Sequence, residues 1–441
     1  DIFCILLGFA SFCSIASLYV AAAAHVIPDN TLPNNSEVKL EGNKSIIEGG
    51  TTAGSNLFHS FEKFGVTTGG EAHFNNAVDI SNIITRVTGN SISDIDGLIK
   101  ANGTANLFLI NPNGIVFGEN ARLDIGGSFV GSTADSIKFG DNIEFSAVNP
   151  QQTPLLSVNV PLGLQYGKPG HIQVKGDGKG VRESSEIADN QNGLRVKSNQ
   201  TLGLVGGDIN LEGAALKTYQ GKIELGSVAT PGLVNIAPVE KGFSFNYDNL
   251  DGGNIELSQQ TTVDADDIQV WGRNIKITDD SVIGTIIFGS EDVGSLIVNG
   301  QESVQMIGNS DGQFTGLFSG VSSQATGKGA DITIKTDNLL VKDGARVRSR
   351  TSGEGNGGSL IVNAQDVQIT GDETSMFASA EENSSGNAGD IAIQTNNLLV
   401  KDNAIINAST FGEGWCGNVS IDAQDVHLTN KSSLFAGSGD N

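Results

Sequence analysis

Few residues of this chain have the type and spacing that catalysis or metal binding requires. His59 and His73 form a possible metal pair, but no third ligand accompanies them, so half-buried structural histidines are the favoured interpretation. The run Asp94–Gly97 begins like a calcium loop and lacks both the third ligand and the downstream Glu, which favours a turn. Cys416 follows Trp415 in a Gly-rich stretch and has no argued His partner, so it is interpreted as an incidental thiol.

Acidic residues are the other candidates for chemistry, since enzymes that act on polysaccharides use paired carboxylates grouped on one face. Here they fall at scattered positions in expected turns, and a solvated surface is the favoured interpretation; examples are Asp264, Asp266, Asp267, Glu381 and Glu382. The sequence also has no P-loop or HExxH motif. We therefore expect no catalytic residues, no cofactor and no metal site, and an enzyme remains only the least favoured alternative.

The amino-acid composition indicates the fold class and the kinds of partner that the chain can have. The chain has 441 residues, 58 of them Gly, with 17% charged residues and a net charge of −24. Abundant Gly with few charges favours short strands joined by tight turns rather than helical bundles. The acidic balance argues against nucleic-acid and anionic-membrane partners, which attract Lys and Arg patches. A large soluble secreted surface is the expectation.

The first 24 residues read as a targeting segment. Residues 2–24 are almost wholly apolar and end in four alanines before His25, which predicts a signal peptide cleaved after Ala24. An uncleaved membrane anchor is the alternative, because the run is long enough to span a bilayer. The chain starts with Asp, so we expect that the basic n-region is missing; after cleavage no membrane span is expected. Cys4 and Cys13 lie in this segment, which leaves Cys416 alone and allows no internal disulfide.

An internal repeat gives the strongest evidence for the fold. DITIKTDNLLVKD at 331–343 returns 59 residues later as DIAIQTNNLLVKD at 390–402. GGSLIVNAQDVQIT at 357–370 returns at the same offset as CGNVSIDAQDVHLT at 416–429. The two halves also match each other, so four units of 28 to 31 residues follow one another, opened by Ile332, Leu360, Ile391 and Val419. A fixed period of this length predicts a solenoid.

Aligning the four units gives columns of one residue type. Three columns are apolar and are predicted to point inward: Ile334, Val362, Ile393, Ile421; Leu339, Val367, Leu398, Val426; and Val341, Ile369, Val400, Leu428. A column of Asn338, Asp366, Asn397 and Asp425 is expected at a corner with side-chain ladders, and a fainter third strand around Val347, Phe377, Ile406 and Leu434. Three strands per unit predict an all-β parallel β-helix of about 14 coils, each of roughly 29 residues. βαβ units would need helices that the sequence lacks, and a sandwich predicts no fixed period.

The stretch Leu107–Ile125 is where the expected coils turn most sharply. It alternates apolar and polar residues, with one break at Asn111-Pro112-Asn113-Gly114. Pro sets φ for the second position of a β-turn, and Asn and Gly suit the positions around it. Two short strands meeting at one tight corner are predicted.

With Gly126-Gly127-Ser128-Phe129 downstream, the NPNGI run at 111–115 resembles the secretion domain of filamentous-haemagglutinin-type two-partner-secretion exoproteins. The resemblance covers roughly Ile27 to Phe145; a second family motif, NPNL, is absent, and Asp79–Ile83 stands in that neighbourhood. The resemblance implies a right-handed parallel β-helix whose partner is an outer-membrane transporter. It also implies a partner-recognition motif formed by Asn111, Pro112, Asn113, Gly114 and Ile115.

These observations give a domain plan and a function hypothesis. We predict a signal peptide at 1–24, a two-partner-secretion domain at 25–150, an irregular β-helix at 151–330, and β-helix repeats at 331–441 that are incomplete at the C-terminus; four prolines between 150 and 169 mark the first boundary. The hypothesis is an adhesin-like exoprotein of a Gram-negative-type bacterium, secreted through the periplasm to the cell surface, with an unknown receptor or polysaccharide as its ligand. The alternatives are the front part of a toxin or effector carrier and, less favoured, an enzyme acting on polysaccharide.

Overall fold

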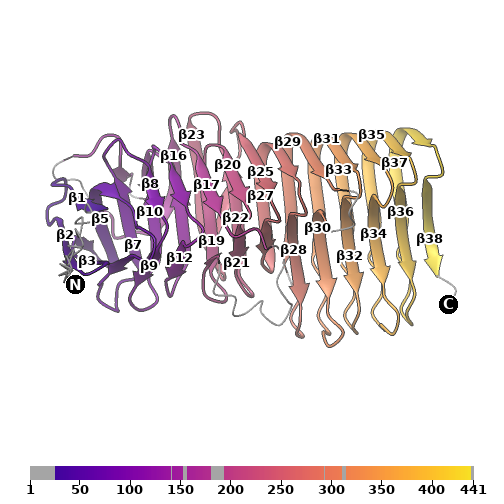
Figure 1. The fold of residues 1–441 in the computed structure, drawn as a ribbon, viewed down its shortest axis with the longest axis horizontal. Helices are drawn as coiled ribbons and strands as arrows, with labels where there is room; N and C mark the ends of the chain where they lie inside the picture. Colours follow the sequence, from indigo (N-terminus) through magenta and orange to yellow (C-terminus); the bar gives the residue numbers. More distant parts are fainter. Residues whose placement is uncertain are drawn as a thin grey trace, which may run out of the picture.

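The computed structural model describes residues 25–140, 142–151, 156–179, 193–292, 294–309 and 314–438. The predicted signal peptide at 1–24 lies outside these residues. Every element in the described part is a β-strand, from β1 to β38. Within these same ranges no helix is long and apolar enough to cross a membrane. The coils stack along one axis into an elongated body, with the indigo first coils at one end and the yellow last coils at the other (Figure 1).

The first stack of the helix contains one parallel strand from each coil. Its twelve strands are β5 (Asn56–Phe64), β7 (Asn82–Val87), β10 (Asn106–Ile110), β13 (Phe129–Ser132), β19 (Thr201–Gly206), β22 (Lys222–Ser227), β27 (Asp267–Ile277), β29 (Ser295–Ile307), β31 (Asp331–Lys342), β33 (Leu360–Thr370), β35 (Ile391–Lys401) and β37 (Val419–Leu428).

A second stack follows the first around the coil. It begins with short separate strands: β8 (Ser93–Ile95), β11 (Ile115–Phe117), β17 (Ile172–Lys175), β20 (Ile209–Glu212) and β25 (Asn254–Ser258). From β27 onward the two stacks share one long bent strand per coil. In β31, Ile334 and Leu339 both point inward although five positions separate them, so the inward side changes parity at the bend.

The third stack consists of two blocks. The first block is β3 (Lys44–Gly49), β6 (Glu71–Phe74), β9 (Leu98–Ala101) and β12 (Arg122–Asp124). The second is β18 (Leu194–Arg195), β21 (Ala215–Lys217), β26 (Thr262–Asp264), β28 (Val282–Ile287), β30 (Gly316–Val321), β32 (Arg346–Thr351), β34 (Ser375–Ala380), β36 (Ile405–Thr410) and β38 (Ser433–Ser438). β12 and β18 belong to different sheets, so the third face has a seam between them.

The register of the last coils confirms the columns predicted from the repeat. Ile334 pairs with Val362, Val362 with Ile393, and Ile393 with Ile421. The columns that begin at Leu339 and Val341 are paired in the same way, and so is the Asn338 column, where Asn397 Nδ2 donates to Asp366 Oδ1 at 2.6 Å. The prediction for the third strand is one residue out of register at a single position. Met376, rather than Phe377, pairs with Val347 and Ile406. Its side chain points into the core and is fully buried, so Phe377 points outward.

The prediction of about 14 coils is too high, because two long insertions leave the helix. The first supplies β14 (Ser136–Phe139), β15 (Glu144–Ser146) and β16 (Pro161–Tyr166), and the second supplies β23 (Gly232–Val239) and β24 (Gly242–Asn246). Together they form one antiparallel five-stranded sheet. Its position is fixed partly by Tyr247, whose ring stacks on Trp271 at 4.4 Å and whose hydroxyl donates to Glu224 Oε1 at 2.7 Å.

The antiparallel sheet covers the outer side of the first stack and creates a second apolar core. The first core runs inside the helix from Val26 to Ala408 without interruption. The second lies between the two sheets, where Phe108 and Ile110 contact side chains such as Phe243. Residues Leu107–Ile110 are therefore buried on both faces rather than alternating apolar and polar. The predicted boundary at 150–151 remains a prediction, and the inner core passes it in one cluster.

Antiparallel strands close the N-terminal end of the helix. β1 (Val26–Pro28) and β4 (Thr51–Ala53) pair with β5, and β2 (Ser36–Glu41) pairs with β3. Arg86, only 1% exposed, ties this cap to the body. Its guanidinium donates to Thr31 Oγ1 at 2.8 Å and to the Ser146 carbonyl at 2.7 Å, and it lies 4.2 Å over the Phe145 ring. One buried cation thus joins the cap, the first coils and the first insertion.

Candidate functional site

The predicted motif forms the corner between β10 and β11. The Gly114 amide donates to the Asn111 carbonyl at 3.1 Å, which closes a β-turn with Pro112 at its second position. Gly114 has φ of +128°, a conformation that side chains disfavour, and an added Cβ would lie 3.0 Å from the His171 carbonyl oxygen. The sequence therefore predicted both the turn and the need for Gly at its end.

Asn111 is the structural centre of the corner, because its side chain is completely buried. Its Nδ2 donates to the Ser91 carbonyl and to Ser93 Oγ, both at 3.0 Å. Its Oδ1 accepts from the Asn113 backbone amide and from Asn113 Nδ2, again at 3.0 Å. The amide side chain thus satisfies all of these groups at once and locks the turn to the preceding coil.

The following coil holds the corner from the other side. The Gly170 amide donates to the Pro112 carbonyl at 2.9 Å, and the Ile115 amide donates to the His171 carbonyl at 3.1 Å. A Cβ on Gly170 would approach the Asn113 carbonyl carbon to 2.5 Å, so only Gly fits there. The motif is consequently one layer in a stack of corners and is held in a single shape.

The solvent side of the corner presents few side chains. Asn113 is exposed, with its Nδ2 donating to the Gly89 carbonyl at 2.8 Å, and Pro112 is half-buried. Ile92, 48% exposed, lies beside Gly114 and begins a shallow depression of about 610 Å³ on the outer side of the second stack. That depression also contains Val116, Asp94 and Glu119. The surface next to the motif therefore combines the exposed Ile92 and the half-buried Val116 with carboxylates and the amino group of Lys175.

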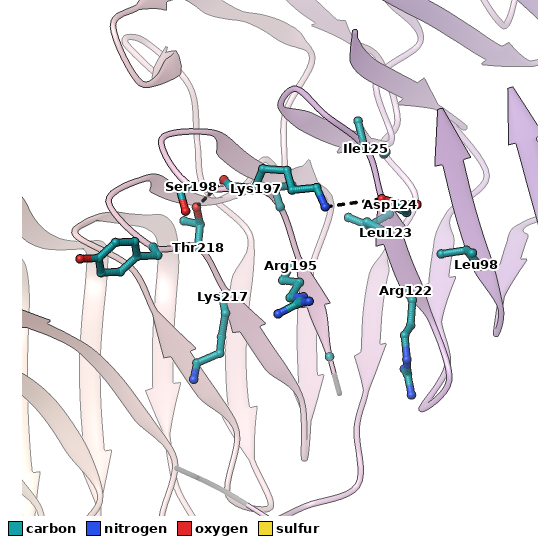
Figure 2. Close-up of a pocket in the computed structure, with 13 residues that line it drawn as sticks. Leu98, Arg122, Leu123, Asp124, Ile125, Arg195, Lys197, Ser198, Lys217 and Thr218 are labelled. Carbon is teal, nitrogen blue, oxygen red and sulfur yellow. Dashed lines mark hydrogen bonds and ion pairs between the residues drawn. The ribbon is translucent and has the colours of Figure 1, made fainter. Parts of the chain in front are cut away.

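A second hollow, of about 600 Å³, lies at the seam of the third stack. Figure 2 shows Lys197 reaching toward Asp124, whereas Arg122, Arg195 and Lys217 point the other way. Lys197 Nζ lies 3.6 Å from Asp124 Oδ1, and Lys217 Nζ lies 3.5 Å from Asp264 Oδ2. The first ion pair spans the gap between β12 and β18, and the second joins the neighbouring strands β21 and β26.

The remaining residues with possible chemistry are separate from one another. In the described ranges no three His, Cys, Asp or Glu side chains are grouped to hold a metal ion. His73 Nε2 contacts Asn102 Oδ1 at 2.8 Å, and Asp96 accepts from the Asn120 amide at 2.8 Å, which makes it a brace for a turn. Cys416 is half-buried and unbonded to another cysteine.

Two acidic positions differ from the predicted solvated surface. Asp264 pairs with Lys217 and its side chain is only 17% exposed; burial raises its pKa to about 6 although Lys217 opposes the shift. Glu381 accepts from Arg348 at 2.8 Å on the third stack. Both carboxylates form ion pairs with cations on neighbouring coils. The partners are far apart in the sequence, so the sequence did not indicate these pairs.

His59 is fully buried, whereas half-burial was predicted. Its Nδ1 contacts Ser36 Oγ at 2.9 Å, and desolvation lowers its pKa to about 3. The signal in the sequence was the run Leu57–Phe61, in which His59 stands between apolar residues that face both cores. A buried imidazole with a lowered pKa stays neutral, so protonation favours the unfolded chain.

This gives a pH prediction for stability. Between pH 6.5 and pH 3 the unfolded chain binds a proton at His59 that the folded chain does not, so the His59 contribution is complete above pH 6.5 and is lost as the pH falls. From pH 7.5 to 5.5 the loss is about 1.4 kcal/mol, the value of one pKa unit. In urea unfolding, wild type should lose that much more stability over this interval than His59→Gln. Equal losses in the two proteins would contradict a neutral buried His59.

Comparison with known proteins places these features in context. The protein-family model named TPS secretion domain matches residues 24–284 of the chain. The crystal structure of the HMW1 secretion domain from Haemophilus influenzae has a similar fold, with a TM-score of 0.61 and 19% identity over 92% of this chain and 97% of that one. The filamentous hemagglutinin secretion domain aligns over 95% and 98% of the two chains at 14% identity, with a TM-score of 0.29. No curated protein matches the sequence.

Proposed function

Because the chain belongs to the TPS (two-partner secretion) secretion domain family, we propose that it is an adhesin-like exoprotein whose N-terminal coils are recognised by a dedicated outer-membrane barrel transporter. The family consists of secretion domains of exoproteins that cross the outer membrane, and it is not a family of enzymes. In this proposal residues 1–24 direct the chain to the periplasm, residues 25–150 carry the recognition surface, and the repeats from 331 onward extend a rod outside the cell.

The observation that carries the proposal is the rigid corner at Asn111–Ile115. Its turn is fixed from within by the buried Asn111 amide and from both sides by neighbouring coils. Little of the motif itself is exposed, so we infer that it acts by shaping the surface beside it. Ile92 and Val116, with the carboxylates of Asp94 and Glu119, supply apolar and acidic contacts there. Such a surface complements a partner segment that carries apolar and basic side chains.

The same fold supports a route of export in which the chain crosses the membrane before it folds. Each coil is stabilised by the coil beneath it, and pairing between strands some 28 residues apart nucleates slowly because loop closure precedes any gain. We infer that the chain stays extended in the periplasm and folds coil by coil outside. Burial of inward Ile, Leu and Val side chains, at about 1.5–3 kcal/mol each, then favours outward movement.

A cross-link between coils tests this route. Asn363 on β33 and Gln394 on β35 are direct partners, and adjacent strands lie within the range that a disulfide can bridge. In a Cys416→Ser background, Asn363→Cys with Gln394→Cys should accumulate in the periplasm when oxidised, because a closed loop cannot pass as a single strand. We expect extracellular protein to fall about tenfold or more, equivalent to at least ~1.4 kcal/mol in the export barrier.

The controls are the two single-cysteine variants and the reduced double variant, all of which should be exported like wild type. Quantitative blotting of medium and periplasm gives the measurement. Export of the oxidised double variant at the wild-type rate would refute passage as an extended chain.

A further inference from the structure

The outer side of the third stack carries phenylalanines at a regular interval. Phe318, Phe377 and Phe435 occupy the centres of β30, β34 and β38, in the segments GLFSG, SMFAS and SLFAG. The register places them in one column with Arg348 and Asn407 between them, in the order Phe, Arg, Phe, Asn, Phe. Figure 1 shows these strands side by side in the second half of the molecule.

The spacing of the rings follows from the strands that carry them. Neighbouring strands lie about 4.8 Å apart, so rings on every second strand are roughly 9.6 Å apart. That distance is close to the length of one disaccharide unit in an extended β-linked glycan. The column also runs along the helix axis, so a linear polymer lying on it would meet successive rings at the same point of each repeat.

Small residues flank the rings on the same strands. Each of the three Phe residues has Gly or Ser two positions before and after it, on the same side of the strand. A Cβ on Gly320 would lie 2.8 Å from two atoms of the Phe318 ring, so this edge of the ring lies close to that Gly. Phe318 and Phe377 are half-buried and Phe435 is 48% exposed. Flat aromatic faces of this kind are surfaces on which the apolar side of a sugar ring packs.

Arginines also lie on this face. Three of the eight arginines in the sequence, Arg346, Arg348 and Arg350, alternate along β32 on this side. Arg346 pairs with Glu373 and Arg348 with Glu381, while Arg350 lies 5.4 Å over the Phe318 ring. Arg346 and Arg348 are each matched by a carboxylate, which leaves Arg350 as the guanidinium of this face with no ion pair among the described residues; guanidinium groups bind carboxylates in bidentate geometry.

Several polar atoms on the same face have no hydrogen-bond partner within the described residues. Asn407 is 5% exposed and lies between Phe377 and Phe435, yet its Oδ1 has no hydrogen-bond partner among the described residues. Ser375 Oγ, Ser409 Oγ and Arg348 Nε are unpartnered in the same sense. A buried polar atom without a partner costs free energy, and the hydroxyl groups of a sugar chain would supply both donors and acceptors.

We propose that the outer face of β30–β38 binds an extended β-linked polysaccharide that carries carboxylate groups, with sugar rings on Phe318, Phe377 and Phe435. The proposal goes beyond secretion and rests on the proposed function in that it names the ligand class of the exported rod. Carboxylates contact Arg350, and hydroxyl groups lie over Asn407 between the rings of Phe377 and Phe435.

The test uses the purified full chain and two matched probes. A β-1,4-linked oligomer of mannuronate and a β-1,4-linked oligomer of mannose, of equal length, differ only in the carboxylate. Calorimetric titration should detect binding of the uronate oligomer and about tenfold weaker binding of the neutral one, since ~1.4 kcal/mol corresponds to tenfold. Because the protein is purified, failure here would leave the secretion proposal intact, and failure of export would leave this binding intact.

Two pairs of variants separate the face from the rest of the molecule. Phe377→Ala should weaken binding about tenfold, whereas Phe411→Ala, an exposed Phe outside the column, should not. Arg350→Gln should abolish the preference for the uronate oligomer, whereas Lys335→Gln on the first stack should preserve it. Absence of binding, equal binding of both oligomers by wild type, or equal effects within either pair would overturn the proposal. Arg350→Gln removes no apolar contact of the core, so it remains decisive if Phe377→Ala folds poorly.

Discussion

Replacing Asn111 by Ala should reduce extracellular protein by about tenfold or more while the remaining coils stay folded. The fully buried side chain makes four hydrogen bonds, and Ala leaves their partners unsatisfied. Unpartnered buried groups of this kind cost about 2–4 kcal/mol in total. Because the long inner core extends well past the corner, the cost falls on the shape of the N-terminal coils and not on the fold as a whole.

Asn113→Ala is the matched control. Asn113 belongs to the same motif but is exposed, and its side chain makes only two of the hydrogen bonds at the corner. If the motif acts through shape, this variant should lose less than about 1 kcal/mol and retain most of its export. Circular dichroism and urea unfolding would establish that both variants are folded, and blotting of the medium would measure export. Wild-type export by Asn111→Ala, or a larger loss from Asn113→Ala, would contradict recognition through shape.

The internal repeat is sufficient to predict the register of the last coils. Columns such as Ile334, Val362, Ile393 and Ile421 follow from a period of about 29 residues and an inward side every second position. The prediction was wrong at Phe377 because both Met376 and Phe377 are apolar, and hydrophobicity alone does not decide which of two adjacent residues faces the core. The difference matters for function, since the outward phenylalanine belongs to the proposed glycan face.

The insertions could not be predicted from periodicity. β14–β16 and β23–β24 leave the helix and return, so their residues have no column to match. One signal was present: Leu107–Ile110 is apolar at every position, which is typical of a strand buried on both faces and therefore of a second layer. Arg86 gave no such signal, because its burial depends on Thr31, Ser60 and Ser146 from three separate segments.

At the candidate site, the sequence predicted the turn but not which of its two Asn side chains is buried and which is exposed. NPNGI indicates a β-turn with Gly at its end, and the structure has that turn. Which Asn is buried depends on Ser91 and Ser93 in the preceding coil and on Gly170 in the next, far beyond the motif in the sequence. Contacts between residues this far apart in the sequence cannot be predicted until the strands of neighbouring coils are placed in register.

The largest expected effect is the dependence of export on the proposed outer-membrane transporter. Proteins of the TPS secretion domain family cross the outer membrane, and the proposal assigns this step to a partner transporter. With the transporter present, protein should accumulate outside the cell. Without it, extracellular protein should fall at least about a hundredfold, equivalent to ~2.7 kcal/mol or more, and the chain should remain in the periplasm.

The most direct measurement is therefore the amount of the full chain in the medium of otherwise identical cells with and without the transporter, compared with a periplasmic marker that reports lysis. The account predicts extracellular protein only when the transporter is present, and a return to the level of the marker when it is removed. Equal amounts of extracellular protein in both strains would contradict it.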